Sequence, residues 1–239
     1  MNDDVLTLKK NAPLILERVR AAQKASPYGQ KVTVCAATKT RSPELINLLP
    51  SLGITTIGEN RVQELLAKYD SLDKSLDIQF IGTLQTNKVK YIIDKVSLIQ
   101  SVDRMELALE IDRQAKKRGI VMKTLCEINV AGEASKSGIP PESASEFIKR
   151  LSDLENISVC GLMCVPPVCV DKYVQKEYFQ RIFELYIDIF GKIRDNNSVR
   201  ILSQGMSGDF ETAIEAGSTM VRIGTALFGP RDYNNKQIN

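Results

Sequence analysis

The segment "VTVCAATKTRSPE", residues 32–44, indicates the architecture of the whole chain. It opens with an apolar, β-branched run, residues 32–37, that is typical of a buried strand. A threonine and a lysine follow, and then a helix start in which Ser42 suits the N-cap and Pro43 the first helical turn. The segment therefore predicts a strand, a short loop that carries Lys39, and a helix.

The same succession of strand and helix recurs along the chain. Helical periodicity separates the predicted strands, and a further helix over residues 5–25 precedes the first of them. The strands are predicted at residues 32–37, 54–57, 78–81, 98–100, 125–130, 157–162, 199–202 and 220–223. A helix after the fourth strand is expected to begin at an N-cap Asp103 and to end at Gly119.

Eight strands that alternate with helices predict a parallel sheet with right-handed crossovers. The 239 residues match the length of a (β/α)8 TIM barrel. An open doubly wound sheet is the alternative, but the glycine-rich first turn of that fold is missing. We expect an α/β protein with one domain over residues 1–239, a (β/α)8 barrel with an extra N-terminal helix.

Composition and charge exclude several classes of protein. The net charge is +3, aromatic residues are only 6%, and the densest basic cluster is "KKRG" at 116–119, so we expect no nucleic-acid binding. The acidic N-terminus argues against a signal peptide, and no apolar run approaches the ~18 residues of a membrane helix. Cys160, Cys164 and Cys169 lack a usual metal-site spacing, so we expect reduced cysteines, no metal site and a cytoplasmic location.

The chain contains no histidine, which restricts its chemistry. Any general base must be Lys, Tyr, Cys, Asp or Glu. Barrel proteins place their sites at the carboxyl ends of the strands, and Lys39 follows the first strand there. A lysine amine in such a place can form a Schiff base with a carbonyl compound, whereas the simpler alternative is a lysine that only extends into solvent.

Two glycine-containing segments near the end of the chain suggest a phosphate site. They are "QGMSGD" at 204–209, after the seventh strand, and "RIGTALFG" at 222–229, after the eighth. Barrels commonly bind phosphate with these loops, and Ser207, Gly224 and Thr225 could supply amides and hydroxyls. Alternatively, Ser207 or Asp209 caps a helix and the glycines make tight turns, and Asp209 would repel a phosphate unless its carboxylate points away.

A phosphate site across the barrel from a Schiff-base lysine matches the two ends of pyridoxal phosphate. Arg222, in the last strand, could face the pyridine nitrogen of that cofactor. An arginine there would keep the nitrogen unprotonated, because a second adjacent cation is unfavourable. The alternative for Arg222 is a salt bridge inside the barrel.

Six segments carry a resemblance to a known family. They are "AATKT" 36–40, "GENRVQE" 58–64, "FIGTLQTNK" 80–88, "SVDR" 101–104, "GLMCVPP" 161–167 and "LSQGMSGDFETAIEAGSTMVRIGTALFG" 202–229. In this order they resemble the YggS/PROSC family of pyridoxal phosphate homeostasis proteins over nearly the whole chain. The resemblance implies the barrel of the alanine racemase N-terminal domain, a cofactor held on the strand-one lysine, and no established catalytic activity.

The resemblance also implies roles for single residues. Lys39 would be the Schiff-base lysine, Arg222 the neighbour of the pyridine nitrogen, and Ser207, Gly224 and Thr225 the phosphate contacts. Asn60 would lie near the cofactor, although Asn60 with Gln63 also suits an N-cap pair. Thr83 and Gln204 depart from the family, which usually has a histidine and a methionine there.

The expected function is that of a pyridoxal phosphate carrier or regulator, not an enzyme. It would be a monomer whose partners include pyridoxal-phosphate-dependent apo-enzymes. One alternative is a pyridoxal-phosphate amino-acid racemase, but the ten residues "PRDYNNKQIN" after the last strand are too few for the domain that supplies a racemase with its tyrosine. Another is a lysine-dependent aldolase, for which Asp103 is the candidate proton shuttle.

Overall fold

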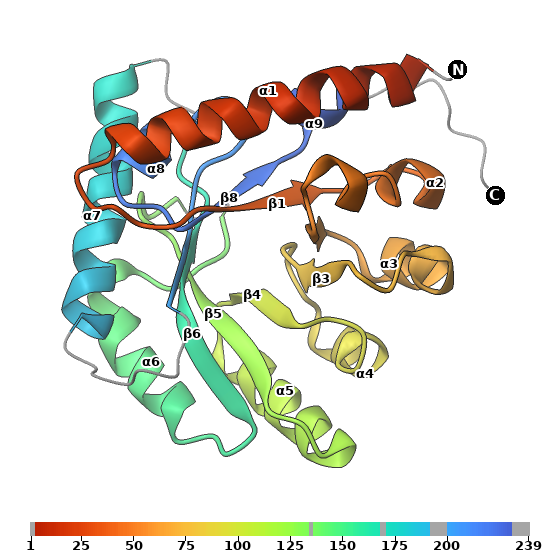
Figure 1. Ribbon diagram of the computed structural model, residues 1–239. Coiled ribbons are helices and arrows are strands. Elements are labelled where there is room, and N and C mark those ends of the chain that lie inside the picture. Colours follow the sequence, from red (N-terminus) through yellow and green to blue (C-terminus); the bar gives the residue numbers. More distant parts are fainter. Residues whose placement is uncertain (1–2, 134–135, 168–170, 192–199, 231–239) are drawn as a thin grey trace.

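Eight parallel strands form a closed barrel in which each strand pairs with the next and β8 pairs with β1 (Figure 1). The computed structural model describes residues 3–133, 136–167, 171–191 and 200–230. The strands are β1 (Thr33–Ala37), β2 (Thr56–Glu59), β3 (Asp77–Phe80), β4 (Leu98–Val102), β5 (Met122–Ile128), β6 (Ile157–Cys164), β7 (Ile201–Ser203) and β8 (Met220–Ile223).

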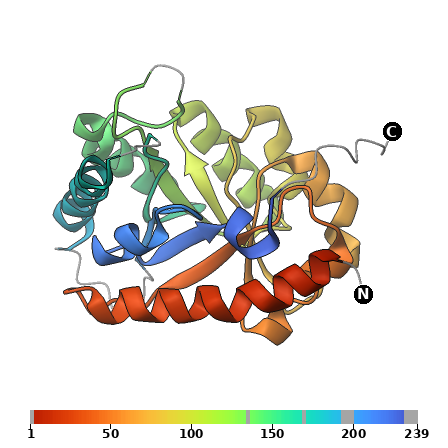
Figure 2. The ribbon, with the colours of Figure 1, turned by 90° about the horizontal axis from the view of Figure 1, so that it is seen from above.

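Helices surround the barrel and cover the outer faces of the strands (Figure 2). The α-helices are α1 (Asp3–Ala25), α2 (Pro43–Ile46), α3 (Val62–Lys68), α4 (Val89–Ile92), α5 (Met105–Arg118), α6 (Ala144–Ser152), α7 (Lys172–Phe190), α8 (Phe210–Glu215) and α9 (Thr225–Phe228). Four short 3-10 turns are η1 (Pro50–Leu52), η2 (Tyr69–Ser71), η3 (Thr86–Lys88) and η4 (Pro141–Ser143).

The predicted barrel is confirmed, and all eight predicted strands are present. Their bounds move by one to a few residues, as is usual when strand ends are read from a sequence. The predicted strand at 199–202 appears as β7, and residue 199 lies outside the described part of the chain. The leading helix is also confirmed as α1.

The helix α1 lies along the outside of the barrel against α8 and α9, so it joins the first and last elements of the chain (Figures 1 and 2). Its buried residues recur every three or four positions, which gives the helix one apolar face. They are Leu8, Ala12, Ile15, Val19 and Ala22. On its exposed side Arg18 forms a two-pronged ion pair with Glu211 of α8, at 2.9 and 2.8 Å.

The interior of the barrel is apolar only in part. Leu98, Leu125, Cys160 and Met163 form a small buried cluster separate from the large core between strands and helices. Gln79, Gln100, Ser203 and Arg222 are also buried. We call the end at which the strands terminate the mouth and the opposite end the floor.

The helix termini confirm two of the predicted caps and correct one. Ser42 is the N-cap of α2, and Gly119 ends α5 in the left-handed region at φ 65°. Asp103 is not the N-cap of α5, because the cap position is Arg104, whose guanidinium donates to the Asp103 carboxylate at 2.6 Å.

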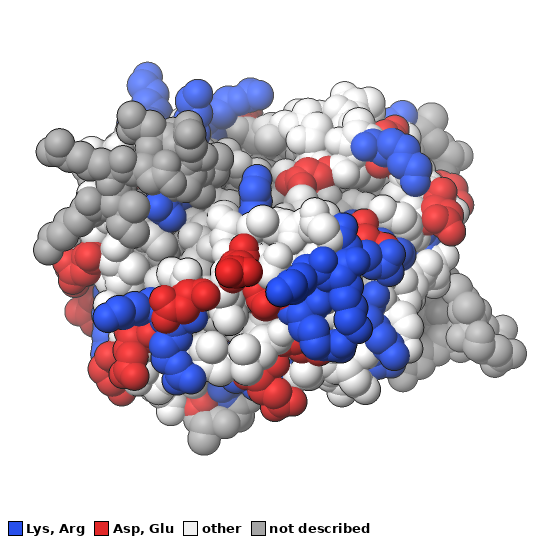
Figure 3. Space-filling model, turned by 90° about the horizontal axis from the view of Figure 1, so that it is seen from below, with Lys and Arg blue, Asp and Glu red and all other residues white. Residues whose placement is uncertain are grey.

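The basic residues of the α5 terminus lie in its last turn, as Lys116, Lys117 and Arg118. Basic side chains gather in one patch on the lower face of the molecule (Figure 3). Arg118 pairs with Asp94 at 3.1 Å. Cations at a helix C-terminus interact favourably with the helix dipole, which accounts for Lys116, Lys117 and Arg118 in this turn.

Candidate functional site

Lys39 lies at the mouth, two residues after the end of β1, and its side chain is half-buried. The next residue, Thr40, has φ 65°, and it is the one non-glycine residue with positive φ in the described part of the chain. Such a conformation costs about 1 kcal/mol for a threonine. The Thr40 amide donates to the Glu64 carboxylate at 2.9 Å, which holds the turn and thereby fixes the position of Lys39.

A buried ion pair supports the backbone beneath Lys39. Lys68, at the end of α3, lies 2.6 Å from Glu59, the last residue of β2. The Lys68 ammonium also donates to the carbonyl of Thr38 at 3.0 Å, and the Thr38 hydroxyl donates to Glu59. Burial raises the pKa of Glu59, while the adjacent Lys68 opposes that rise.

The phosphate site predicted near the C-terminal end of the chain has a defined geometry. The Ser207 hydroxyl accepts hydrogen bonds from the backbone amides of Gly224 and Ala226, each at 3.1 Å. Because its oxygen receives two N–H groups, its own hydrogen is directed away from them and can be donated to a ligand. Thr225 is the first residue of α9 and is exposed, so its hydroxyl is accessible beside Ser207.

Each oxygen of the Asp209 carboxylate accepts a hydrogen bond. Its Oδ1 accepts from the Met206 amide at 2.5 Å, and its Oδ2 accepts from Gln175 of α7 at 2.6 Å. Asp209 occupies the N-cap position of α8, as one sequence interpretation expected. The carboxylate is therefore bound by its own loop and by α7.

Arg222 is almost completely buried, with 5% of its surface exposed. Its NH1 donates to the Ser203 carbonyl at 2.8 Å and to the Ser203 hydroxyl at 2.6 Å, and its NH2 donates to the Cys164 carbonyl at 2.8 Å. Burial lowers the pKa of this guanidinium. No salt bridge in the described part of the chain includes Arg222, so the salt-bridge alternative is not supported there.

A carboxyl group that the sequence interpretation missed lies near Arg222. Glu127, the second-last residue of β5, is buried, and burial together with the charge of Asp103 raises its pKa to about 7. Its Oε2 has no hydrogen-bond partner in the described structure. A glutamate inside the apolar run "TLCEINV" is the signal that could have revealed it, because a buried carboxylate is costly.

Asn60 lies directly after β2, and its side-chain oxygen is buried without a described partner. The N-cap interpretation of Asn60 and Gln63 is wrong, because α3 begins at Val62 with Arg61 in the cap position. The backbone carbonyl of Asn60 packs so closely on Gly82 that a Cβ there would lie 2.2 Å from it. Asn60 is thus fixed at the mouth with an unused acceptor.

The pairing of β1 with β8 brings the two halves of the predicted site together. Cys35 is paired with Arg222, and Ala36 with Ile223. A Cβ built on Gly224 would lie 3.4 Å from the Cβ of Ala37, which shows that the ends of the two strands are adjacent. Lys39, Arg222 and the Ser207–Gly224 contact therefore share one side of the mouth.

The cysteines show no metal site among the residues that the structure describes. Cys35, Cys126, Cys160 and Cys164 are buried free thiols, and no group of potential ligands is close enough to hold an ion. Cys169, the third member of the cysteine motif, lies outside the described residues.

Two residues, Thr83 and Gln204, depart from the family pattern. Thr83 is exposed, whereas Gln204 is buried and its side-chain amide donates to the Phe179 carbonyl at 3.3 Å.

Comparison with known proteins shows to which family the chain belongs. The family model described as the alanine racemase N-terminal domain matches residues 12–232. A pyridoxal phosphate homeostasis protein of Aquifex aeolicus is 44% identical over 221 residues, which cover 92% of this chain and 96% of the relative. The chain belongs to the pyridoxal phosphate homeostasis protein family. A second member of this family, from Pseudomonas aeruginosa, is 37% identical over 95% of this chain and 97% of its own length.

A solved structure extends the comparison with this homeostasis family to three dimensions. PipY of Synechococcus elongatus PCC7942, determined with pyridoxal phosphate bound, has 28% sequence identity and a TM-score of 0.76. The match covers 89% of this chain and 99% of PipY. The barrel described above is therefore a fold that this chain shares with PipY.

Proposed function

We propose that this protein binds pyridoxal phosphate at the mouth of the barrel and takes part in pyridoxal phosphate homeostasis as a carrier or regulator. The observation that carries the proposal is the pairing of β1 with β8, which brings the end of β1, just before Lys39, next to Gly224 and its contact with Ser207. Membership of the homeostasis family and the pyridoxal phosphate bound to PipY support it. Pyridoxal phosphate supplies an aldehyde that can form a Schiff base with an amine, and its pyridine ring supplies an electron sink.

The residues at the mouth fit such a group. Lys39 would hold the cofactor covalently through its amine, and the strained Thr40 turn would orient that amine. Ser207 and Thr225 would bind the phosphate with one free hydroxyl hydrogen and an exposed hydroxyl, and Gly224 would hold the Ser207 hydroxyl in place through its backbone amide. Asn60 has an unpartnered buried oxygen, which could accept from a polar group of the cofactor.

Arg222 determines which chemistry the site favours. Its guanidinium is held by three bonds to neutral acceptors and would face the ring nitrogen with its positive charge. A permanent cation there disfavours protonation of the ring nitrogen, which weakens the electron sink needed for carbanion chemistry. This supports a carrier without catalytic activity over a racemase.

The raised pKa of Glu127 is the observation that favours an enzymatic alternative. A carboxyl group with a pKa of about 7 near the mouth could move protons at neutral pH. The racemase and aldolase alternatives are therefore worth a direct assay.

If the protein is a carrier, the recipients of its cofactor would be pyridoxal-phosphate-dependent apo-enzymes, and the protein would act as a cytoplasmic monomer. In the described part of the chain, no helix has both the length and the apolar character that crossing a bilayer requires.

Trapping of the bound cofactor tests this proposal. The protein is mixed with pyridoxal phosphate, its visible absorption is recorded, the complex is reduced with borohydride, and the modified peptide is mapped by mass spectrometry. We expect one adduct, on Lys39, and none in Lys39→Ala. Lys123→Ala is the matched control, because Lys123 is an exposed lysine of β5 at the opposite end of the barrel. Adducts spread over several surface lysines would reject the proposal.

Racemase, transaminase and aldolase assays on the loaded protein then separate a carrier from an enzyme. Turnover that is lost in Lys39→Ala would establish the enzymatic alternative. Absence of turnover, together with transfer of the cofactor to an apo-enzyme, is the result expected of a carrier.

A further inference from the structure

A line of hydrogen bonds runs through the interior of the barrel from Arg222 to the floor. Arg222 donates to the Ser203 hydroxyl at 2.6 Å, and that hydroxyl donates to Oε1 of Gln100 at 2.7 Å. The Gln100 amide donates to Oε1 of Gln79 at 2.6 Å, and the Gln79 amide donates to Oδ2 of Asp77 at 2.7 Å. We call these five side chains the polar relay.

Every link of the polar relay has the same direction. Ser203, Gln100 and Gln79 each accept a hydrogen bond from the neighbour on the Arg222 side and donate one to the neighbour on the Asp77 side. The hydroxyl and the two amides are therefore aligned dipoles. The line starts at a buried cation and ends at a carboxylate. Aligned hydrogen bonds polarise one another in a low-dielectric interior, which strengthens the whole line.

The relay connects Arg222, which has no ion-pair partner in the described structure, to the Asp77 carboxylate through hydrogen bonds. The titratable groups that act on Arg222 are Cys35, Cys164, Glu127 and Asp209, which lie on four other segments. None of them forms an ion pair with Arg222 in the described structure. An uncompensated buried charge is costly, so the alignment toward Asp77 contributes to keeping the guanidinium in place.

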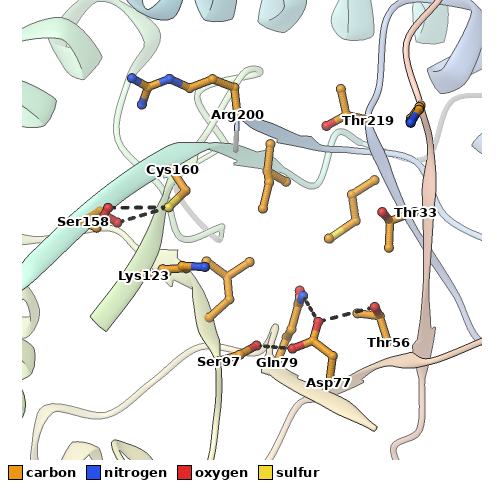
Figure 4. Close-up of a pocket in the computed structure, with 14 residues that line it drawn as sticks. Thr33, Thr56, Asp77, Gln79, Ser97, Lys123, Ser158, Cys160, Arg200 and Thr219 are labelled. Atoms are coloured by element: carbon orange, nitrogen blue, oxygen red, sulfur yellow. Dashed lines mark hydrogen bonds between the residues drawn. The ribbon is translucent and has the colours of Figure 1, made fainter. Parts of the chain in front are cut away.

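The floor end of the relay opens on a cavity of about 700 Å³ (Figure 4). There the Asp77 carboxylate also accepts hydrogen bonds from Ser97 and, at 3.4 Å, from Thr56. Asp77 is half-buried, while Gln79 beside it is almost fully buried. The charge that terminates the relay therefore lies where solvent can reach it, at the end of the barrel away from Lys39.

We infer that Ser203, Gln100, Gln79 and Asp77 are positioning residues for Arg222: the polar relay holds the guanidinium against the cofactor ring and links its charge to Asp77 at the barrel floor. This inference rests on the proposed function, because it assigns the relay a role toward the cofactor. Its consequence is that a change at the floor alters the electrostatic environment of the cofactor at the mouth.

The pH titration of the cofactor's visible absorption band measures that environment. Gln100→Met removes two links with little change in volume, and Asp77→Asn keeps the acceptor for Gln79 but removes the charge. Each change leaves the Arg222 charge less compensated, which disfavours a protonated, positively charged cofactor adduct. We expect the titration midpoint to fall by about half a pH unit in Gln100→Met, and by less, in the same direction, in Asp77→Asn.

The control is Thr124→Val. Thr124 is a fully buried residue of β5 outside the relay, and its hydroxyl has no described partner. A role limited to core stability would lower the melting temperature of the relay variants and leave the midpoint unchanged, which would overturn the inference. If Gln100→Met does not fold, Asp77→Asn decides the question, because it keeps the size and shape of the side chain.

A second measurement on the cofactor-free protein separates this inference from the proposed function. The exchange of the Arg222 guanidinium protons with water is followed by NMR in the wild type, Gln100→Met and Asp77→Asn. Faster exchange in both variants is expected, and equal exchange would contradict the relay. If the wild type gives no visible band and no Lys39 adduct, the proposed function fails, while the exchange data still decide whether the relay holds the guanidinium.

Discussion

Lys68 and Glu59 form an ion pair of 2.6 Å that is almost completely shielded from water beneath the residue that precedes Lys39. The pair joins the end of β2 to the end of α3, and through the Thr38 carbonyl it also holds the end of β1. Two neighbouring strands and a helix are thus fixed at one point. The two side chains thus help to set the position of the lysine that we propose binds the cofactor.

Removal of one partner of this pair is expected to be strongly destabilising. Lys68→Met would leave the Glu59 carboxyl buried without its cation and the Thr38 carbonyl without its donor. The free energy of unfolding should fall by about 3–5 kcal/mol near pH 7. Urea unfolding measures this change.

The loss should be smaller near pH 4, because a protonated Glu59 needs no cation. The double variant Glu59→Gln/Lys68→Met serves as control and should recover part of the stability at pH 7. A single variant as stable as the wild type at pH 7 would contradict the structural role of the pair.

Ser207→Ala is expected to weaken the binding of pyridoxal phosphate but not of pyridoxal. The substitution removes the hydroxyl hydrogen proposed for the phosphate and the acceptor of the Gly224 and Ala226 amides. A hydrogen bond to a charged group contributes about 1.5 kcal/mol, so the Kd should rise about tenfold. Absorbance titrations with both compounds measure the difference, and an equal loss for the two would remove Ser207 from the phosphate site.

Glu127→Gln is expected to change how stability depends on pH in the cofactor-free protein. The pKa of Glu127 is raised from 4.5 to about 7 in the folded state. The folded protein therefore binds this proton more tightly than the unfolded chain does. The stabilisation is fully present below pH 4.5 and is lost as the pH rises through 7.

The variant should lack this contribution to the pH dependence and be more stable than the wild type at pH 8, by on the order of 2 kcal/mol. Thermal unfolding between pH 4 and pH 8 provides the comparison. Parallel curves for the two proteins would show that Glu127 titrates normally.

Gly82→Ala is expected to disrupt the mouth. The added Cβ would lie 2.2 Å from the Asn60 carbonyl oxygen, and backbone cannot move aside cheaply at the junction of two strands. A loss of about 2–4 kcal/mol in the free energy of unfolding should result. Gly208→Ala is the matched control, because no atom lies within 4 Å of a Cβ at that position. If both variants are equally stable, β2 and β3 have more freedom at their ends than the structure indicates.

The sequence was sufficient to predict the barrel, because its strands and helices alternate with clear apolar runs. It also placed Lys39, Ser207 and Gly224 correctly at strand ends, where a parallel barrel collects its polar groups. These positions depend only on local pattern and on the rule that the strands point the same way.

Other features depend on contacts between distant strands and could not be predicted in this way. Glu59 and Lys68 become partners only when α3 packs on β2, and Glu127 acquires its pKa only through burial beside Asp103. The glutamines of "DIQF" and "LIQSV" stand out as polar residues in buried strands, but their alignment requires the barrel interior. The cap assigned to Asp103 was wrong because Arg104 binds the carboxylate that would have capped the helix.

The closure of the barrel by β1 and β8 also has a consequence for biosynthesis. Lys39 is translated early and Gly224 late in the 239-residue chain, yet the two flank the same site. Until β8 has left the ribosome, α1 and β1 have no partner on one side, and the site that we propose for the cofactor is incomplete. If the cofactor binds where we propose, it would enter a finished site only after the polypeptide is almost complete, so each newly made molecule would begin empty and take up free cofactor.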